Sequence, residues 1–349
     1  MSAASQFQHP ANPGTRGVTL ARPVHILTGY LGSGKTTLLS RLLRDPALAD
    51  TAVVINELGE VGLDHVLVDR GSEDDVVLLD SGCLCCALGN SLQETLESLH
   101  YRRERNELPP FSRVIVETTG VADPGPIIAT LDLDAAIARH YRPGSIVTVV
   151  DATNGVEHLA RFDEARRQVA VADAIVVSKL DLVAQLPMDL DARLRALNPH
   201  ARRGRGDEPD LFAAHAIARS LAPACDDHSD HDHLAEQGIA TTTVRLDAPL
   251  PWPRYAAWVQ WMRQALGARL LRMKGVARMD DGDICALHAV MQVFSAPQRM
   301  TAMPPGLGDG VVVIIAQHVG RDVLDEARRR LTGDAHTTQD LQRTGTAST

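Results

Sequence analysis

The first part of the chain alternates between short apolar runs and longer segments whose apolar residues recur at helical spacing. Mostly β-branched apolar runs predict strands at residues 24–27, 52–55, 76–79, 113–116, 146–150 and 174–177. Helical spacing predicts helices at residues 88–105, 125–131, 162–172 and 190–197. Because strands covered by helices on both faces form nearly continuous apolar runs, this alternation predicts an α/β fold with a mostly parallel sheet.

A different pattern begins near residue 239. Strands are expected at residues 241–246, 270–276, 286–294 and 311–317, with a final helix at 323–331. A further helix follows the first of these strands, and its apolar stripe, interpreted as core, consists of Tyr255, Trp258, Val259, Met262 and Leu266. The mixture predicts a small α+β domain without catalytic motifs, suited to docking a partner or to regulation of a dimer.

These patterns divide the chain into five segments. We expect a flexible tail at 1–21, a phosphate-loop domain at 22–220, a His- and Asp-rich linker at 221–238, the α+β domain at 239–332 and a disordered tail at 333–349. The N-terminal segment lacks an apolar signal core, which favours a cytoplasmic location.

Composition narrows the function. The net charge of −9 argues against a nucleic-acid partner, because binding to phosphate backbones needs excess basic charge. No run of about 18 apolar residues occurs, so no membrane partner is expected. Three of the five cysteines crowd together, which points to metal or redox chemistry rather than to a disulfide framework.

Residues 29–37 read GYLGSGKTT, a phosphate-binding loop between a predicted strand and a predicted helix. Lys35 is expected to reach the β and γ phosphates and Thr36 to ligate Mg²⁺, while backbone N–H groups cradle the polyphosphate. The nucleotide-binding candidates in this loop are Gly29, Gly32, Ser33, Gly34, Lys35, Thr36 and Thr37. The fold class is therefore predicted to be a P-loop NTPase.

In parallel sheets, ligands bind at the carboxyl ends of the strands, so the residues after each strand carry information. Glu117 and Gly120 lie at the end of one strand, where a γ-phosphate sensor would be expected. Ser178, Lys179 and Asp181 follow another, and the Asp181 carboxylate could accept two hydrogen bonds from guanine, which favours GTP over ATP. Lys35, Thr36 and Glu117 are the catalytic candidates.

The cysteine cluster is Cys83, Cys85 and Cys86, expected on a loop after a strand. Metal binding by thiolates is the favoured interpretation, with a redox pair or simple burial as alternatives. A fourth ligand could come from the acidic, glycine-broken segment 56–64, which is suited to a mobile switch; candidates near it are Glu57, Glu60, Asp64 and His65. In the linker, His228, His231 and His233 suit loose metal loading or a merely solvated segment.

Five motifs in order, GYLGSGKTTLL, NELGEVGLD, SGCLCC, ETTGVADP and SKLD, resemble those of the CobW-type metallochaperone GTPases, relatives of the urease and hydrogenase nickel-insertion GTPases. The resemblance implies slow, Mg²⁺-dependent GTP hydrolysis coupled to delivery of zinc or cobalt to a client metalloprotein, and homodimerisation across the nucleotide. It assigns the phosphate and Mg²⁺ roles to Gly32, Gly34, Lys35, Thr36 and Glu117, and the metal role to Cys83, Cys85 and Cys86.

One residue departs from the family pattern. GTPases usually begin the base-recognition motif with Asn, and this chain has Ser178, whose hydroxyl is expected to reach less far toward the base and the phosphate loop. Two other functions remain open: a GTP-controlled metal sensor that transfers no metal, and an ATP-dependent small-molecule kinase with a structural zinc.

Overall fold

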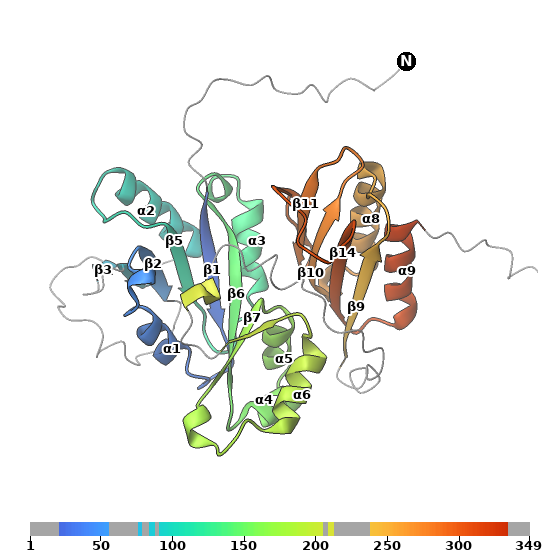
Figure 1. Cartoon of the computed structure of the whole chain (residues 1–349). Coiled ribbons are helices and arrows are strands. Elements are labelled where there is room, and N and C mark those ends of the chain that lie inside the picture. Colours follow the sequence, from blue (N-terminus) through green and yellow to red (C-terminus); the bar gives the residue numbers. More distant parts are fainter. Residues whose placement is uncertain are drawn as a thin grey trace, which may run out of the picture.

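The computed structural model describes residues 21–55, 76–78, 84–87, 91–204, 209–212 and 238–333. Within these ranges the chain forms two units, each built on its own sheet (Figure 1). The first sheet has the strand order β3-β4-β2-β5-β1-β6-β7-β8. Its strands are β1 (Arg22–Thr28), β2 (Thr51–Ile55), β3 (Val76–Leu78), β4 (Leu84–Ala87), β5 (Arg113–Glu117), β6 (Tyr141–Asp151), β7 (Ala174–Ser178) and β8 (Arg202–Gly204).

Helices cover both faces of this sheet. They are α1 (Lys35–Leu42), α2 (Leu92–Glu104), α3 (Gly125–Leu133), α4 (Gly155–Arg161), α5 (Asp163–Ala170) and α6 (Met188–Leu197), with short 3₁₀ helices η1 (Pro46–Leu48), η2 (Ile137–Arg139), η3 (Leu180–Leu182) and η4 (Pro209–Phe212). Leu39 of α1 packs with Val53 of β2, whereas Leu96 of α2 packs with Val54 of the same strand. Neighbouring residues of one strand are thus buried on opposite faces. Because every pairing except β3–β4 is parallel, the predicted mostly parallel α/β sheet is confirmed.

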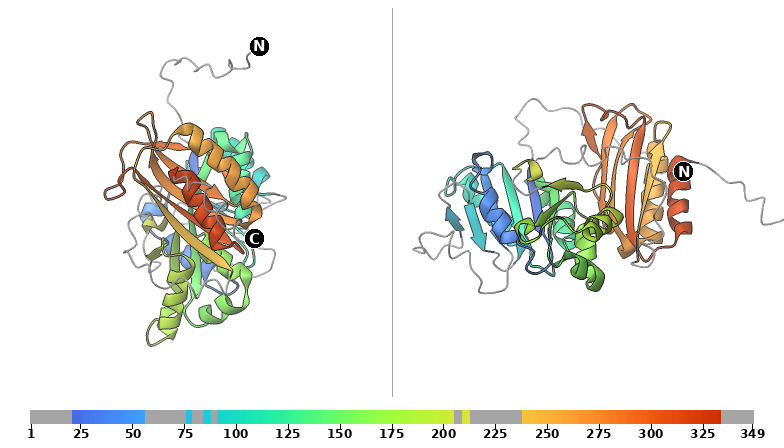
Figure 2. Two further views of the ribbon diagram at one scale, coloured as in Figure 1. Left: turned by 90° about the vertical axis from the view of Figure 1, so that its right-hand side faces the viewer. Right: turned by 60° about the horizontal axis from the view of Figure 1, so that its bottom comes forward.

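The second sheet is antiparallel and lies beside the first unit (Figures 1 and 2). It consists of β9 (Ile239–Leu246), β10 (Leu270–Arg278), β11 (Ile284–Val290), β12 (Val293–Phe294), β13 (Gln298–Met300) and β14 (Gly310–Gln317). The helices α8 (Trp252–Ala265) and α9 (Arg321–Thr332) cover the face turned away from the first unit, and η6 (Gly267–Arg269) precedes β10.

The strand β14 explains why this sheet looks apolar throughout. Val312 and Ile314 pack in the cluster that includes Trp258 of α8. Val313 and Ile315 instead join a cluster that includes residues of the first unit. An antiparallel sheet normally alternates apolar and polar residues because one face is wet, but here both faces are covered.

The structure contains α4 and β13, which were not predicted, and three further segments differ from what was expected. The segment 286–294, expected as one strand, forms β11 and β12 with a tight turn at Met291, whose φ of 52° is left-handed. The segment 202–204, where no strand was predicted, is the strand β8, which pairs with β7 at the sheet edge. The cysteine segment, expected as a loop, contains the strand β4.

Candidate nucleotide site

The glycine-rich loop joins β1 to α1, as predicted. Gly29, Gly32 and Gly34 have φ values of 149°, 69° and 89°, a region that L side chains rarely adopt. A Cβ at Gly29 would lie 2.3 Å from the carbonyl oxygen of Val149, so a larger residue does not fit there. The buried ammonium of Lys35 donates to the carbonyl oxygen of Gly29 at 3.0 Å. This backbone is the concave conformation that binds phosphate oxygens at a helix N-terminus.

Thr36 and Glu117 meet beside this loop. The Thr36 hydroxyl donates to Oε1 of Glu117 at 2.6 Å. Glu117 is 1% exposed and lies opposite Leu27 in the parallel pairing of β5 with β1, so the sheet itself sets its position. A hydroxyl and a carboxylate oxygen at the mouth of a phosphate loop are ligands that Mg²⁺ prefers. The residues present therefore fit the expected Mg²⁺ site.

The loop after β5 touches the phosphate loop directly. The Thr118 hydroxyl donates a hydrogen bond to the Thr28 hydroxyl at 2.9 Å, and the Thr118 N–H donates to the carbonyl oxygen of Leu27. A Cβ at Gly120 would lie 2.7 Å from both the N and the Cα of Leu31. Only glycine permits this approach, which places the expected γ-phosphate sensor against the loop that would hold the phosphates.

Ser178 links β7 to the phosphate loop. Its hydroxyl donates to the carbonyl oxygen of Ser33 at 2.5 Å and lies 3.4 Å from the carbonyl oxygen of Val150. The serine hydroxyl was expected to reach less far than an asparagine amide, and in the structure it does reach the phosphate loop. The reach is sufficient because β7 lies close to the loop: a Cβ at Gly34 would be only 3.7 Å from the Ser178 side chain.

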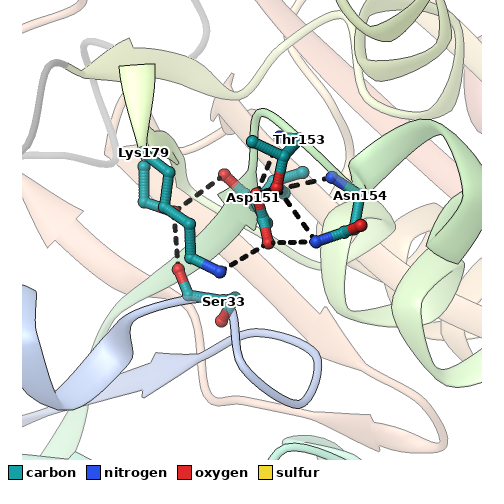
Figure 3. Close-up of polar contacts among 7 residues, drawn as sticks. Ser33, Asp151, Thr153, Asn154 and Lys179 are labelled. Carbon is teal, nitrogen blue, oxygen red and sulfur yellow. Dashed lines mark hydrogen bonds and ion pairs between the residues drawn. The ribbon is translucent and has the colours of Figure 1, made fainter. Parts of the chain in front are cut away.

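Lys179 is fixed by a carboxylate that sequence analysis missed. Its ammonium donates to Asp151 at 2.7 Å, and Asp151 also accepts from the Thr153 N–H and hydroxyl and from the Asn154 side chain (Figure 3). Burial alone would raise the pKa of Asp151, but these hydrogen bonds outweigh it and hold the pKa far below its usual range. Asp181 lies on η3 with an exposed side chain.

A signal for Asp151 was present in the sequence. It is the last residue of β6 at the carboxyl edge of the sheet, the place where ligand-contacting residues were sought after the other strands. The second residue missed is Gln168 of α5, whose amide donates to the loop after β5. Its helix-interior position carries no motif, so only the structure reveals this contact.

The described cysteines of the cluster lie on a strand next to β2. Cys85 pairs with Val53 and Cys86 with Val54 in the parallel pairing of β4 with β2. The loop prediction is wrong here because Leu84–Ala87 is a short apolar run, and cysteine behaves as a small apolar residue in a sheet. Val54 in turn pairs with Val116, so the backbone of Cys86 is level with the residue before Glu117.

Several predicted ligands lie outside the described residues, and their roles stay predictions: Cys83, Glu57, Glu60, Asp64, His65, His228, His231 and His233. In the described part of the chain, no three His, Cys, Asp or Glu side chains gather as a metal-binding group. No helix in that part is long and apolar enough to cross a membrane.

A glycine loop between a parallel strand and a helix, with a buried lysine and a Thr–Glu pair at the neighbouring strand, defines a P-loop NTPase. Residues 23–203 match the family described as CobW/HypB/UreG, nucleotide-binding domain, and residues 239–331 match the cobalamin synthesis protein cobW C-terminal domain. The chain belongs to the CobW/HypB/UreG family.

Two curated relatives span most of the chain. The zinc chaperone YjiA of Escherichia coli is 30% identical over 281 residues, covering 78% of this chain and 87% of that protein. The zinc-regulated GTPase metalloprotein activator 1 of Schizosaccharomyces pombe is 28% identical over 317 residues, covering 78% and 76%. The crystal structure of Zn(II)-bound YjiA GTPase from E. coli has the same fold, with a TM-score of 0.68 and 24% identity over 90% of this chain and 99% of that one.

Proposed function

We propose that the protein is a GTPase that acts as a metallochaperone, carrying zinc or cobalt at Cys83, Cys85 and Cys86 and delivering it to a client metalloprotein. The observation that carries the proposal is one shared sheet edge. Glu117 ends β5, and Cys86 lies level with the residue before it, two strands away. At about 4.8 Å per strand, the two backbones are roughly 10 Å apart. The relatives named as zinc chaperone and zinc-regulated GTPase support both the nucleotide and the metal.

GTP would bind across the carboxyl edge of the sheet. Its phosphates would enter the concavity of Gly29–Lys35, and its base would lie toward η3, where the exposed Asp181 carboxylate can accept from the guanine ring N–H and amine. Lys179 borders this place, and its ion pair with Asp151 fixes its direction. Ser178 lies against Gly34, so it connects the base side of the site, at the end of β7, to the phosphate loop.

Hydrolysis would use groups that are already in position. Lys35 would neutralise charge on the phosphates as it develops, and Thr36 with Glu117 would hold Mg²⁺, which supplies further positive charge there. The carboxylate of Glu117 would orient water at the γ phosphate. Because the Glu117 side chain is fixed by Thr36 and by the pairing of β5 with β1, this orientation requires no rearrangement of the sheet.

The metal is cargo, and nucleotide would control its affinity. Thiolates favour zinc and other borderline or soft ions. The strand β2 lies between β5 and β4 and continues after Ile55 into the segment expected to switch with nucleotide. A change transmitted along β2 would alter the surroundings of the cysteines. A homodimer formed across the nucleotide would be a further point of control.

The test is to measure zinc and cobalt affinity with GDP and with a non-hydrolysable GTP analogue. We expect the two nucleotide states to differ roughly 5–150-fold in metal affinity, with the same factor appearing in nucleotide affinity when metal is added. The triple change Cys83→Ser, Cys85→Ser, Cys86→Ser should remove the binding.

Each part of the proposal can fail separately. Equal metal affinities with GDP and with the analogue would leave a GTPase with an incidental metal site. Unchanged binding in the triple variant would move the site, with His228, His231 and His233 examined next. Transfer of metal to an apo client only when GTP is hydrolysed separates a chaperone from a metal sensor, and competition of GTP against ATP tests the base assignment.

A further inference from the structure

Gln168 is a buried polar side chain that connects α5 to the loop after β5. It is 1% exposed. Its amide nitrogen donates to the carbonyl oxygen of Gly120 at 3.1 Å and to that of Ala122 at 3.0 Å. A single amide therefore fixes two peptide groups of a loop that lies 46–48 positions earlier in the sequence.

This loop is held between two contacts. On one side Gly120 lies so close to Leu31 of the phosphate loop that a Cβ would be 2.7 Å from the Leu31 backbone. On the other side lies Gln168. Within the loop the N–H of Ala122 donates to the carbonyl oxygen of Thr119, which closes a turn. The side chain of Gln168 therefore helps to set the position of this loop relative to the phosphate loop.

Gln168 itself is anchored to the strands that carry the site. The hydroxyl of Thr148 on β6 donates to the backbone oxygen of Gln168 at 2.7 Å, and Thr148 lies opposite Thr28, the last residue before the phosphate loop. Gln168 and Ser33 line the same small cavity beneath that loop. Gln168 thus contacts β6 through its backbone and the loop after β5 through its side chain, and it lines a cavity together with Ser33 of the phosphate loop.

We propose that Gln168 is a positioning residue for GTP hydrolysis, holding the loop at 119–122 where it meets the γ phosphate without touching the nucleotide itself. The inference rests on the proposed GTPase function. It predicts a specific division of effects. The cradle for the α and β phosphates is built from residues 29–36, and Gln168 donates no hydrogen bond to that cradle. The binding of GDP should therefore be independent of the Gln168 amide, whereas hydrolysis of GTP should depend on it.

The test variant is Gln168→Met, which keeps the length of the side chain and removes both donors. At saturating GTP we expect hydrolysis to fall roughly 10–100-fold, as expected when two buried carbonyl groups lose their donor. Affinity for a non-hydrolysable GTP analogue should fall several-fold, and affinity for GDP should stay within about twofold of the parent.

Asn198, the C-cap residue of α6, offers a matched control. Asn198 is also a buried amide, and it donates to the carbonyl oxygens of Val169 and Ala170 at the end of the same helix α5 and to that of Ala172 just beyond it. Asn198→Leu removes three hydrogen bonds and should lower Tm. It should leave the ratio of analogue to GDP affinity, and hydrolysis per folded molecule, unchanged.

The outcomes are distinguishable. A parent protein that does not hydrolyse GTP would refute the proposed function. A parent that does, with Gln168→Met hydrolysing at the same rate or losing GDP and analogue affinity equally, would overturn the role of Gln168. Gln168→Glu, which replaces the donors with a carboxylate, should repeat the pattern of Gln168→Met.

Hydrogen exchange in the parent protein tests the same proposal without a variant. The backbone amide of Ala122 should exchange more slowly with the GTP analogue bound than with GDP bound, and equal exchange would contradict the proposal.

Discussion

At the scale of single residues, the Ser178 hydroxyl determines how the phosphate loop is oriented. It donates to the carbonyl oxygen of Ser33, the peptide group that also carries the N–H of Gly34. Because C=O and N–H point in opposite directions in a trans peptide, holding the oxygen toward β7 points the Gly34 N–H away from β7. A serine in this motif therefore keeps the connection to the phosphate loop.

Ser178→Ala should weaken GDP and GTP binding alike. Loss of a hydrogen bond of about 0.5–1.5 kcal/mol corresponds to roughly 2–10-fold in affinity for each nucleotide. Titration calorimetry with GDP and with a GTP analogue measures both. An effect confined to GTP would contradict the assignment, because Gly34 lies in the part of the loop that both nucleotides use.

Asp181→Asn should act differently. It should shift the nucleotide preference toward xanthine nucleotides without a uniform loss of affinity for all nucleotides.

The positions of site residues were predictable where they follow from a motif or from a strand end. Lys35, Thr36 and Glu117 are brought together as the sequence predicts, since the motif specifies both the chemistry and the local fold. Gln168 could not be found in this way. Its partners lie 46–48 positions away, and which polar side chain reaches them depends on how α5 packs on the sheet.

At the scale of elements, β6 accommodates a buried histidine from β1. The pairing of the two strands shifts register between Val24 and Ile26. There the N–H of Ser145 donates to Nδ1 of His25 at 2.9 Å, and a Cβ at Gly144 would lie 2.7 Å from the same nitrogen. His25 is fully buried, and this burial, reinforced by the charges of Arg113 and Arg142, lowers its pKa to about 3.

This histidine should make folding pH-dependent. Between about pH 6.5 and 3 the unfolded chain binds a proton at His25 and the folded chain does not, so stability falls as pH falls, by up to about 1.4 kcal/mol per pH unit. His25→Asn keeps a hydrogen-bond acceptor near Ser145 but cannot titrate. Urea unfolding from pH 7 to 4 should therefore show a shallower decline in the variant than in the parent.

The matched control is His318→Asn. His318 is exposed, and its φ of 52° is a conformation that asparagine tolerates. This change should leave the pH slope of the parent intact. Identical slopes for His25→Asn and the parent would show that protonation elsewhere governs acid unfolding.

Element boundaries were predictable where both faces of a strand are apolar, as in β5 and β14. They were missed where pairing, not side-chain pattern, defines the strand. The strand β8 is polar, yet it forms because β7 offers a free edge, and Arg203 pairs with Asp191 of α6. The tight turn at Met291 was missed because the sequence lacks the glycine or asparagine that usually marks a left-handed residue.

At the scale of the whole molecule, the two units are joined by an apolar interface with a buried charge cluster inside it. Asp173, just before β7, accepts from Arg272 at 2.6 Å and from Lys274, both on β10. Its second oxygen accepts from the N–H of Ile146. Burial alone would raise the pKa of Asp173, but the two cations outweigh it and lower the pKa to about 2.

Asp173→Asn should loosen the second unit from the first. Removing one member of a buried ion cluster costs about 3–5 kcal/mol, because the remaining charges lose their shared carboxylate inside the protein. Urea unfolding should change from one transition toward two. The parent should lose part of this contribution as pH falls from about 4 toward 2, since the depressed pKa makes the folded state favour the ionised carboxylate.

The matched control is the triple change Asp173→Leu, Arg272→Met, Lys274→Met, which removes all three charges and keeps apolar volume. Such replacements are often neutral or stabilising, so this variant should keep one transition. It should also lose the part of the acid sensitivity that Asp173 supplies. If Asp173→Asn unfolds in one transition with undiminished stability, the apolar contacts of Val313 and Ile315 with the first unit hold the domains together without the charges.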